Sequence, residues 1–219
     1  MSKRKKNRDL WRQQWKTPRC VIAFDQSYTC TGIAVAVDDS VRLVRWESFK
    51  GCKTKTDKRK RLRLVSEKVI KKALTKFSPC DIIVLVERIR TITNHRNEDL
   101  VTGKPILSTD YIKSTGALVA MIVDVATEYG IKVYSVATVA WKAQILGSSK
   151  PLVEFIEGVK DPQKIASVKN AIKLGYGEQI KITSTNGRGY KYCDDAADAL
   201  NISLYGFLPP KKLNLHREE

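Results

Sequence analysis

The pattern of apolar and polar positions predicts that the chain opens with three strands. Residues 20–25 form a short apolar run, and a polar turn at 26–31 separates it from a second run at 32–37. A third segment, 41–49, alternates between apolar and polar residues, which is typical of a strand with one buried face. Because short turns connect these segments, we expect the three strands to be antiparallel.

The rest of the chain predicts helices that alternate with two further buried strands. The helices are expected at 58–77, 110–129, 138–146, 151–159, 161–174 and 193–207, and the strands at 81–86 and 131–136. Continuous apolar runs such as DIIVLV are typical of strands that are buried on both faces. Strands reached through helical crossovers join a sheet in parallel. The order of elements therefore predicts an α/β fold with a mixed central sheet of about five strands, the first three antiparallel, flanked by helices.

The length and the charge distribution indicate one folded domain with two charged ends. A chain of 219 residues suits one α/β domain better than two. We assign residues 1–19 to a basic N-terminal arm, 20–208 to the folded domain and 209–219 to a charged C-terminal tail. No apolar run is long enough to cross a bilayer, and charged residues stand where a signal peptide needs an apolar segment. We therefore expect an intracellular, cytoplasmic protein.

The net charge of +17 favours a polyanionic partner. Residues 53–76 alone hold eleven Lys or Arg residues and two acidic residues. Nucleic acid is the first candidate. A membrane surface is the weaker one, because no amphipathic segment pairs its basic face with exposed Trp, Phe and Leu. Five scattered cysteines without a Cys-x-x-Cys pair, and only two histidines, argue against disulfides, zinc sites and histidine-rich metal sites.

Acidic residues stand at particular points of this arrangement. Asp25 interrupts the first apolar strand, where an unpaired carboxylate would be costly, and Glu87 ends the fourth strand. Asp195 and Asp198 are three positions apart on the last helix, and Asp194 is four positions before Asp198, so both pairs share one helix face. Separately, these acids are explained as a turn cap, a solvent-facing strand end and partners of the helix dipole. Together, in a chain with 23 acids and 40 bases, they predict one carboxylate site.

A carboxylate cluster without His or Cys favours hard cations such as Mg²⁺ or Mn²⁺. Carboxylates from three separate elements can hold two such ions about 4 Å apart. Such a pair activates a water molecule and stabilises the leaving oxygen in phosphodiester hydrolysis. A basic surface around an acidic pocket also suits a DNA nuclease, because the bases bind the phosphate backbone while the acids bind the metal. We therefore predict two-metal-ion phosphodiester hydrolysis.

Three stretches of the sequence carry a family resemblance: the first strand IAFDQSYTCTGIAV, the strand end IIVLVER and the helix DDAADALNISL. Through them the chain resembles, over about residues 20–208, the RuvC-like Holliday-junction resolvases of the RNase H-like superfamily, particularly their bacteriophage relatives. It implies a crossover-junction endodeoxyribonuclease of DNA recombination and repair, selective for Holliday junctions or other branched DNA. It also implies a homodimer with two symmetric sites, each with two Mg²⁺ or Mn²⁺ ions and no nucleotide cofactor. The metal ligands and catalytic residues that it implies are Asp25, Glu87, Asp195 and Asp198, with Asp194 as the substitute for Asp195.

The resemblance also implies basic DNA contacts beside the site. Lys142 and Lys164 match the family's basic residues on the stretch after the fifth strand. Arg188 is a further candidate, because its NGRG loop is close in sequence to the last helix. Arg90 stands where the bacterial enzymes carry an aromatic residue that stacks at the junction, and it is the fourth DNA-binding candidate. This departure predicts looser selectivity, extending to three-way and flap DNA.

Two alternative functions remain open at this point. The DQSYTCTG turn also resembles the phosphate-binding hairpin of actin-like and sugar-kinase ATPases, whose half-domain shares this fold. Those proteins need a second domain and further glycine-rich loops, for which a chain of 219 residues lacks room. A non-catalytic DNA-binding scaffold is the other alternative, and the intact carboxylates argue against it.

Overall fold

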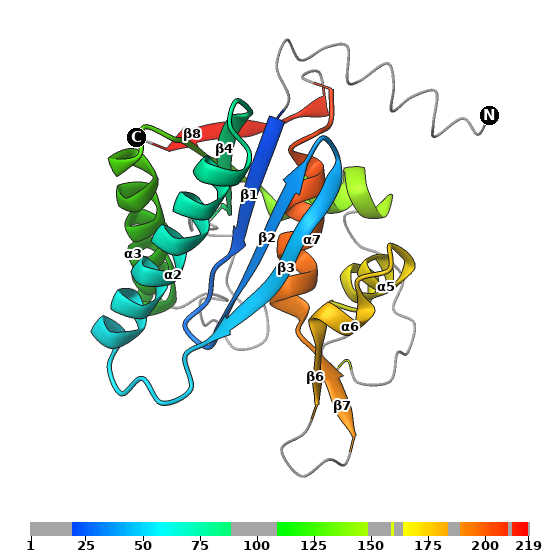
Figure 1. Cartoon of the computed structure of the whole chain (residues 1–219). Coiled ribbons are helices and arrows are strands. Elements are labelled where there is room, and N and C mark those ends of the chain that lie inside the picture. The colour runs from blue at the N-terminus through cyan, green and yellow to red at the C-terminus, as the bar shows by residue number, and fades with distance from the viewer. Residues whose placement is uncertain are drawn as a thin grey trace, which may run out of the picture.

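The computed structural model describes residues 19–88, 109–148, 159, 164–183, 189–209 and 212–218. Within these ranges a six-stranded sheet has the strand order β3-β2-β1-β4-β5-β8 (Figure 1). The strands are β1 (Arg19–Asp25), β2 (Cys30–Val37), β3 (Ser40–Ser48), β4 (Asp81–Glu87), β5 (Lys132–Val136) and β8 (Leu215–Glu218). The first three strands are antiparallel, β4 and β5 run parallel to β1, and β8 is antiparallel to β5. The predicted α/β class and mixed sheet are confirmed.

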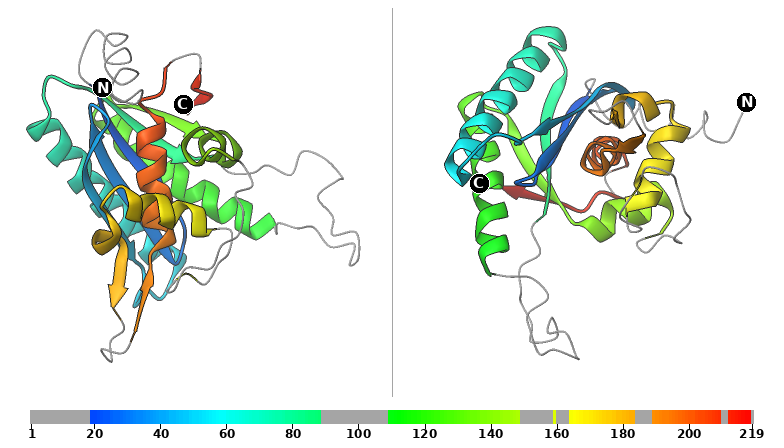
Figure 2. Two further views of the ribbon diagram at one scale, coloured as in Figure 1. Left: turned by 90° about the vertical axis from the view of Figure 1, so that its right-hand side faces the viewer. Right: turned by 90° about the horizontal axis from the view of Figure 1, so that it is seen from below.

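Helices cover both faces of the sheet (Figure 2). Their bounds are α2 (Lys55–Lys76), α3 (Thr109–Glu128), α4 (Thr138–Trp141), the π-helical turn η2 (Lys142–Leu146), α5 (Ile165–Lys173), α6 (Gly177–Ile180) and α7 (Asp194–Tyr205). α2 and α3 lie side by side on one face, and α7 lies against the other face, with α5 and α6 beyond it. A hairpin of β6 (Lys181–Thr183) and β7 (Tyr190–Tyr192) precedes α7. No helix in the described ranges is both long enough and apolar enough to span a membrane.

The alternation of side chains along β1 divides its residues between two cores. Val21 and Ala23 belong to the core beneath α7, whereas Ile22 belongs to the core beneath α2 and α3. Asp25 continues the series of Val21 and Ala23, so its side chain lies on the α7 face. β4 runs parallel to β1 and repeats this alternation, which places Glu87 on the same face at the end of the neighbouring strand. The strand period therefore aims both acids at α7.

A close approach between β2 and α7 occurs at Gly32. Gly32 pairs with Asp25 across the β1–β2 hairpin. A Cβ atom added to Gly32 would lie 1.9 Å from the backbone oxygen of Asp195, so no larger residue fits there without movement of the helix. The absence of a side chain therefore lets the first turn of α7 lie directly on the sheet, beside Asp25.

α2 begins three residues before the start that the apolar stripe predicts. Thr54 caps the helix, and its side chain accepts from the backbone N–H of Asp57, whose carboxylate accepts from Thr54 in return. This capping box satisfies free helix amides without any apolar residue. Because the apolar stripe carries no sign of this box, the stripe alone predicts a helix start at Lys58. The stripe itself is as expected, because Leu62 and Val69 are buried.

Some elements differ from the pattern or are absent from it. β8 lies within the segment 209–219 that the sequence assigns to a charged tail, and its residues LHRE contain no apolar run. The helix expected at 138–146 is divided between α4 and η2. The helix expected at 161–174 begins at Ile165 among the described residues, and residues 151–158 of the helix expected before it lie outside them.

Candidate carboxylate site

The carboxyl ends of β1 and β4 meet the start of α7 at one end of the sheet. Asp25 ends β1, Glu87 ends β4, and Asp195 and Asp198 lie in the first two turns of α7. Asp25 is 6% exposed and Asp198 is 2% exposed. The structure thus brings the four predicted acids together from three separate elements.

The ammonium group of Lys164 lies among these acids. Its Nζ is 2.8 Å from Asp198 Oδ2 and 3.7 Å from both Asp25 Oδ2 and Asp195 Oδ1. Lys164 directly precedes α5, and its side chain is 24% exposed. Three carboxyl groups therefore surround one ammonium. We call these residues (Asp25, Asp195, Asp198 and Lys164) the carboxylate cluster.

Burial and repulsion between neighbouring acids disfavour ionisation of Asp25 and Asp195. Burial raises the pKa of Asp25 well above its ordinary value, the charge of Glu87 raises it further, and Lys164 opposes both. Burial likewise raises the pKa of Asp195 to about 6, against the opposing effect of Lys164. Burial acts to lower the pKa of the Lys164 ammonium, but the three carboxylates outweigh burial and raise it. An additional cation would therefore be stabilised here.

Two carboxylate oxygens of the cluster, Asp25 Oδ2 and Asp198 Oδ1, are buried without a hydrogen-bond partner. Buried polar atoms of this kind cost free energy unless a partner binds them. As the side chains stand, no three or more His, Cys, Asp or Glu residues of the described ranges are arranged to hold a metal ion. The Lys164 ammonium, within 3.7 Å of three of these carboxyl groups, is instead the cation at their centre.

Two residues that the sequence pattern does not single out, Trp141 and Gln26, hold Glu87. Trp141 is fully buried, and its Nε1 donates to Glu87 Oε1 at 3.2 Å. Gln26 Nε2 donates to the backbone oxygen of Glu87 at 2.8 Å. A buried indole N–H needs an acceptor. Trp141 ends α4, the short helix that follows β5, and β5 pairs with β4, so this contact becomes visible only in the folded arrangement.

Hydrogen bonds between α5 and α7 hold Lys164 near the acids. Asn201 of α7 is fully buried, and its Nδ2 donates to Ser167 Oγ at 3.1 Å. Asn170 Nδ2 donates to Asn201 Oδ1 at 2.6 Å. Ser167 and Asn170 are both on α5, shortly after Lys164. The sequence pattern does not assign a role to Asn201 either, although Asn201 is a polar residue in an apolar helix, three positions after Asp198.

Asp194 and Asp195 have different surroundings. Asp194 Oδ1 accepts a hydrogen bond from the backbone N–H of Asp195 at 3.2 Å, whereas the Asp195 carboxylate faces Lys164. The preceding residue, Cys193, has its Sγ 3.5 Å from that of Cys30. This contact, together with burial, raises the pKa of the Cys30 thiol. Of the two acids, Asp195 is the one that joins the carboxylate cluster.

Two of the four predicted DNA contacts lie among the described residues. Lys142 begins η2, and its Nζ is 5.4 Å from the ring centre of Trp141, the residue that donates to Glu87. Lys164 lies within the carboxylate cluster. Arg90 and Arg188 lie outside the described residues, so their roles stay predictions.

Comparison with known proteins identifies the fold. No family model and no curated protein matches the sequence. A solved structure described as T. thermophilus RuvC in complex with Holliday junction substrate aligns over 86% of this chain and 93% of its own, with a TM-score of 0.52 and 13% identity. A second, described as Thermus thermophilus RuvC structure, aligns with the same coverage and TM-score at 16% identity. These likenesses confirm the RNase H-like fold and, at such low identity, show the fold alone.

Proposed function

We propose that this protein is a metal-dependent endonuclease that cleaves phosphodiester bonds in branched DNA, with the four-way junction as its main substrate. The observation that carries this proposal is the buried carboxylate cluster at the end of an RNase H-like sheet. The net charge of +17 supports a DNA partner, since phosphate contacts dominate the affinity of proteins for DNA. The RuvC protein of similar fold was solved with a Holliday junction substrate.

The donor set suits Mg²⁺ or Mn²⁺. All four acids offer hard carboxylate oxygens, and Asp25 Oδ2 and Asp198 Oδ1 have no hydrogen bond to lose when a cation binds. We expect Asp25, Glu87, Asp195 and Asp198 to hold two ions per site. When bound, these ions lower the pKa of the attacking water and stabilise the charge on the leaving oxygen.

The protein's own residues position the site and balance its charge. Trp141 and Gln26 fix the orientation of Glu87 through the hydrogen bonds described above. Lys164 partly neutralises the acids while no other cation is bound. A bound phosphate beside the cluster would offer the Lys164 ammonium a second anionic partner. Divalent cations would displace the ammonium from the acids, and the DNA phosphate would attract it.

Replacement of Lys164 by Gln tests this balance. Loss of the ammonium leaves the three acids of the cluster, two of them buried, without their counter-charge, so we expect a destabilisation of roughly 2–4 kcal/mol in the absence of divalent ions. Mg²⁺ should restore more stability to this variant than to the wild type, because it no longer competes with the ammonium. Thermal unfolding with and without Mg²⁺ measures both effects. Lys173→Gln, at an exposed position of α5, the helix that Lys164 precedes, is the control; equal Mg²⁺ responses of the two variants would contradict the role of Lys164.

A panel of DNA substrates tests the proposed function. We expect Mg²⁺- or Mn²⁺-dependent nicks in a four-way junction, placed symmetrically across the branch because a homodimer presents two equivalent sites. Three-way and flap DNA should be cut more weakly, and linear duplex hardly at all. Failure of metal-loaded protein to cut any of these substrates would contradict the proposal, and junction binding without cleavage would support the scaffold alternative.

The ATPase alternative finds less support in the β1–β2 turn. Ser27 Oγ accepts hydrogen bonds from the backbone N–H groups of Thr29 and Cys30, at 3.4 and 3.1 Å. Backbone N–H groups of such a turn are what a bound phosphate would need, and here they already have an acceptor. Hydrolysis of ATP by the purified protein in the absence of DNA would favour this alternative over the nuclease.

A further inference from the structure

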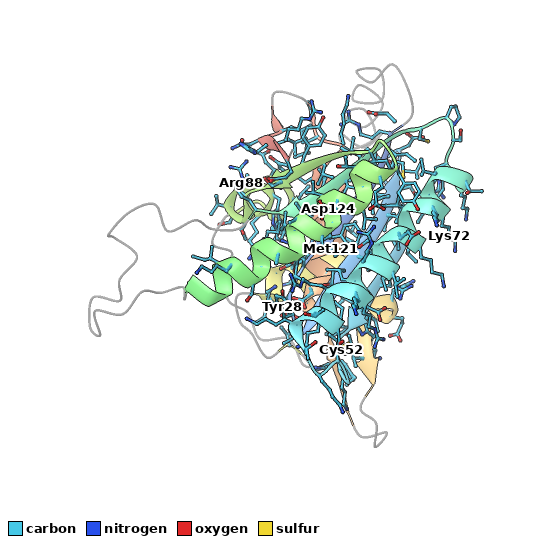
Figure 3. All side chains as sticks on the ribbon, turned by 90° about the vertical axis from the view of Figure 1, so that its left-hand side faces the viewer. Tyr28, Cys52, Lys72, Arg88, Met121 and Asp124 are labelled. Atoms are coloured by element: carbon cyan, nitrogen blue, oxygen red, sulfur yellow. The ribbon has the colours of Figure 1, made fainter. Side chains whose placement is uncertain are left out.

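A group of positive charges lies at the same end of the sheet, on the face opposite α7. Lys55 and Lys58 begin α2, and their Nζ atoms lie 5.9 and 6.0 Å from the ring centre of Tyr28. Tyr28 belongs to the turn after β1 and packs against the core beneath α2 and α3, the face seen in Figure 3. We call Tyr28, Lys55 and Lys58 the lysine–tyrosine corner.

The start of α2 is an unfavourable place for so many cations. The N-terminus of a helix carries partial positive charge, which disfavours Lys and Arg there. Nevertheless Lys55, Lys58, Arg59 and Lys60 lie in the first six residues of α2, with Asp57 as the acid of the first turn. Within the described ranges, none of these four cations forms an ion pair with an acidic side chain. The arrangement costs the helix stability and would favour a bound anion.

Tyr28 holds the two lysines of the corner in place. A cation near an aromatic face is attracted by the charge distribution of the ring, and both ammonium groups share one ring here. Lys55 Nζ also donates to Ser114 Oγ of α3 at 2.7 Å. Two ammonium groups held near one another repel, and an anionic group bound to both would relieve this repulsion.

The corner is close to the carboxylate cluster along the chain. Tyr28 follows Asp25 by three positions, so their Cα atoms are at most about 11 Å apart. This distance corresponds to roughly three nucleotides along the axis of a DNA strand. Between them, Gln26 is anchored to the backbone oxygen of Glu87, which fixes the turn beside the site.

We propose that the lysine–tyrosine corner binds the phosphate backbone of the DNA strand that enters the carboxylate site. Lys55 and Lys58 contact the phosphates, and Tyr28 is a positioning residue that aligns them. The inference rests on the proposed function and adds a second contact surface, on the sheet face opposite α7, for the same DNA. DNA is favoured over an anionic membrane because the exposed large apolar side chains of the described ranges (Leu64, Val139, Ile172 and Leu174) lie outside the corner.

The salt dependence of junction binding tests this proposal. In an Asp25→Asn background with Mg²⁺, where cutting is not expected, the pair Lys55→Gln and Lys58→Gln is compared with the pair Lys68→Gln and Lys72→Gln. The control pair removes the same charge from exposed positions roughly 20 Å further along α2. Each lost phosphate contact lowers the slope of log K against log salt by about one. We expect the corner pair to lower the slope by about two and to weaken junction binding roughly ten-fold, and the control pair to change both clearly less.

Substitutions of Tyr28 separate alignment from folding. Tyr28→Phe keeps the ring and should bind as the parent protein does, whereas Tyr28→Leu should lower the salt slope with an unchanged thermal midpoint. Equal slopes for the corner pair and the control pair would overturn the inference, even if the wild-type protein cuts junctions. If the wild-type protein neither bound nor cut junctions, the proposed function itself would fail. Loss of binding to phosphatidylserine vesicles in the corner pair, with junction binding intact, would overturn the inference in favour of a membrane.

Discussion

Asp25→Asn is expected to abolish Mg²⁺-dependent cleavage of a four-way junction, with a loss of at least ~10³-fold in rate. Asn has nearly the shape of Asp but lacks its charge and one of its two carboxylate oxygens, so it binds a divalent cation poorly. Metal ions supply several kcal/mol of transition-state stabilisation, and a 10³-fold loss corresponds to about 4 kcal/mol. Single-turnover cleavage of a labelled junction measures the loss of the chemical step directly.

The same variant is expected to fold at least as well as the wild type at neutral pH. Burial, followed by the charge of Glu87, raises the pKa of Asp25 in the folded protein. A carboxyl group of this kind destabilises the fold above its unfolded pKa of about 4, because ionisation then favours the unfolded chain. We expect a gain of about 1 kcal/mol for Asn, or roughly 2–4 °C in the thermal midpoint, which disappears as the pH falls below about 4. Lost cleavage with retained stability would therefore reflect chemistry, not unfolding.

Other acids provide the controls for this experiment. Asp124→Asn makes the same change at an exposed position of α3 and should leave the cleavage rate unchanged. Asp198→Asn should lose cleavage as Asp25→Asn does, and wild-type rates in both would show that the metal-site assignment is wrong. Asp194→Asn should retain more activity than Asp195→Asn, because Asp194 accepts from the helix backbone whereas Asp195 faces the cluster.

The central fold is predictable because its signals are local. An apolar run interrupted at Asp25, two buried strands and helices with apolar stripes indicate the mixed sheet without any knowledge of long-range contacts. β8 is different, because its four residues have no pattern of their own and become a strand by pairing with the edge of β5. The start of α2 also escapes the pattern, since it depends on the hydrogen bonds between Thr54 and Asp57.

The acids of the candidate site are detectable for a related reason. Each one interrupts or ends an apolar element, so its presence requires an explanation. Trp141 does not stand out in this way, because a buried tryptophan is ordinary core until its partner is known. The position of Lys164 depends on how α5 packs against α7 through Asn201, a contact between segments far apart in the chain. The sequence indicates a basic residue there, but not that its ammonium lies among the acids.

Gly32→Ala adds only one methyl group, yet it is expected to lower both the stability of the fold and the rate of cleavage. The new Cβ would lie 1.9 Å from the backbone oxygen of Asp195, 2.2 Å from its carbonyl carbon and 2.6 Å from the backbone nitrogen of Ala196. Backbone atoms cannot rotate away, so α7 must shift. We expect a destabilisation of about 3 kcal/mol. A shift of about 1 Å at the acids would lower the cleavage rate roughly 10²-fold, because it moves Asp195 and Asp198 away from Asp25.

Gly206, at the other end of α7, provides a control that separates the loss of stability from the loss of cleavage. A Cβ atom there would meet side-chain atoms, with Val21 Cγ2 the nearest at 2.9 Å, and its backbone φ of −61° suits alanine. Because a valine side chain yields more readily than a helix backbone, Gly206→Ala should cost less stability and leave cleavage close to the wild-type rate. Urea unfolding and junction cleavage, measured on both variants, test the comparison. If Gly32→Ala cut junctions at the wild-type rate, the close contact of α7 with β2 would not be what positions the acids.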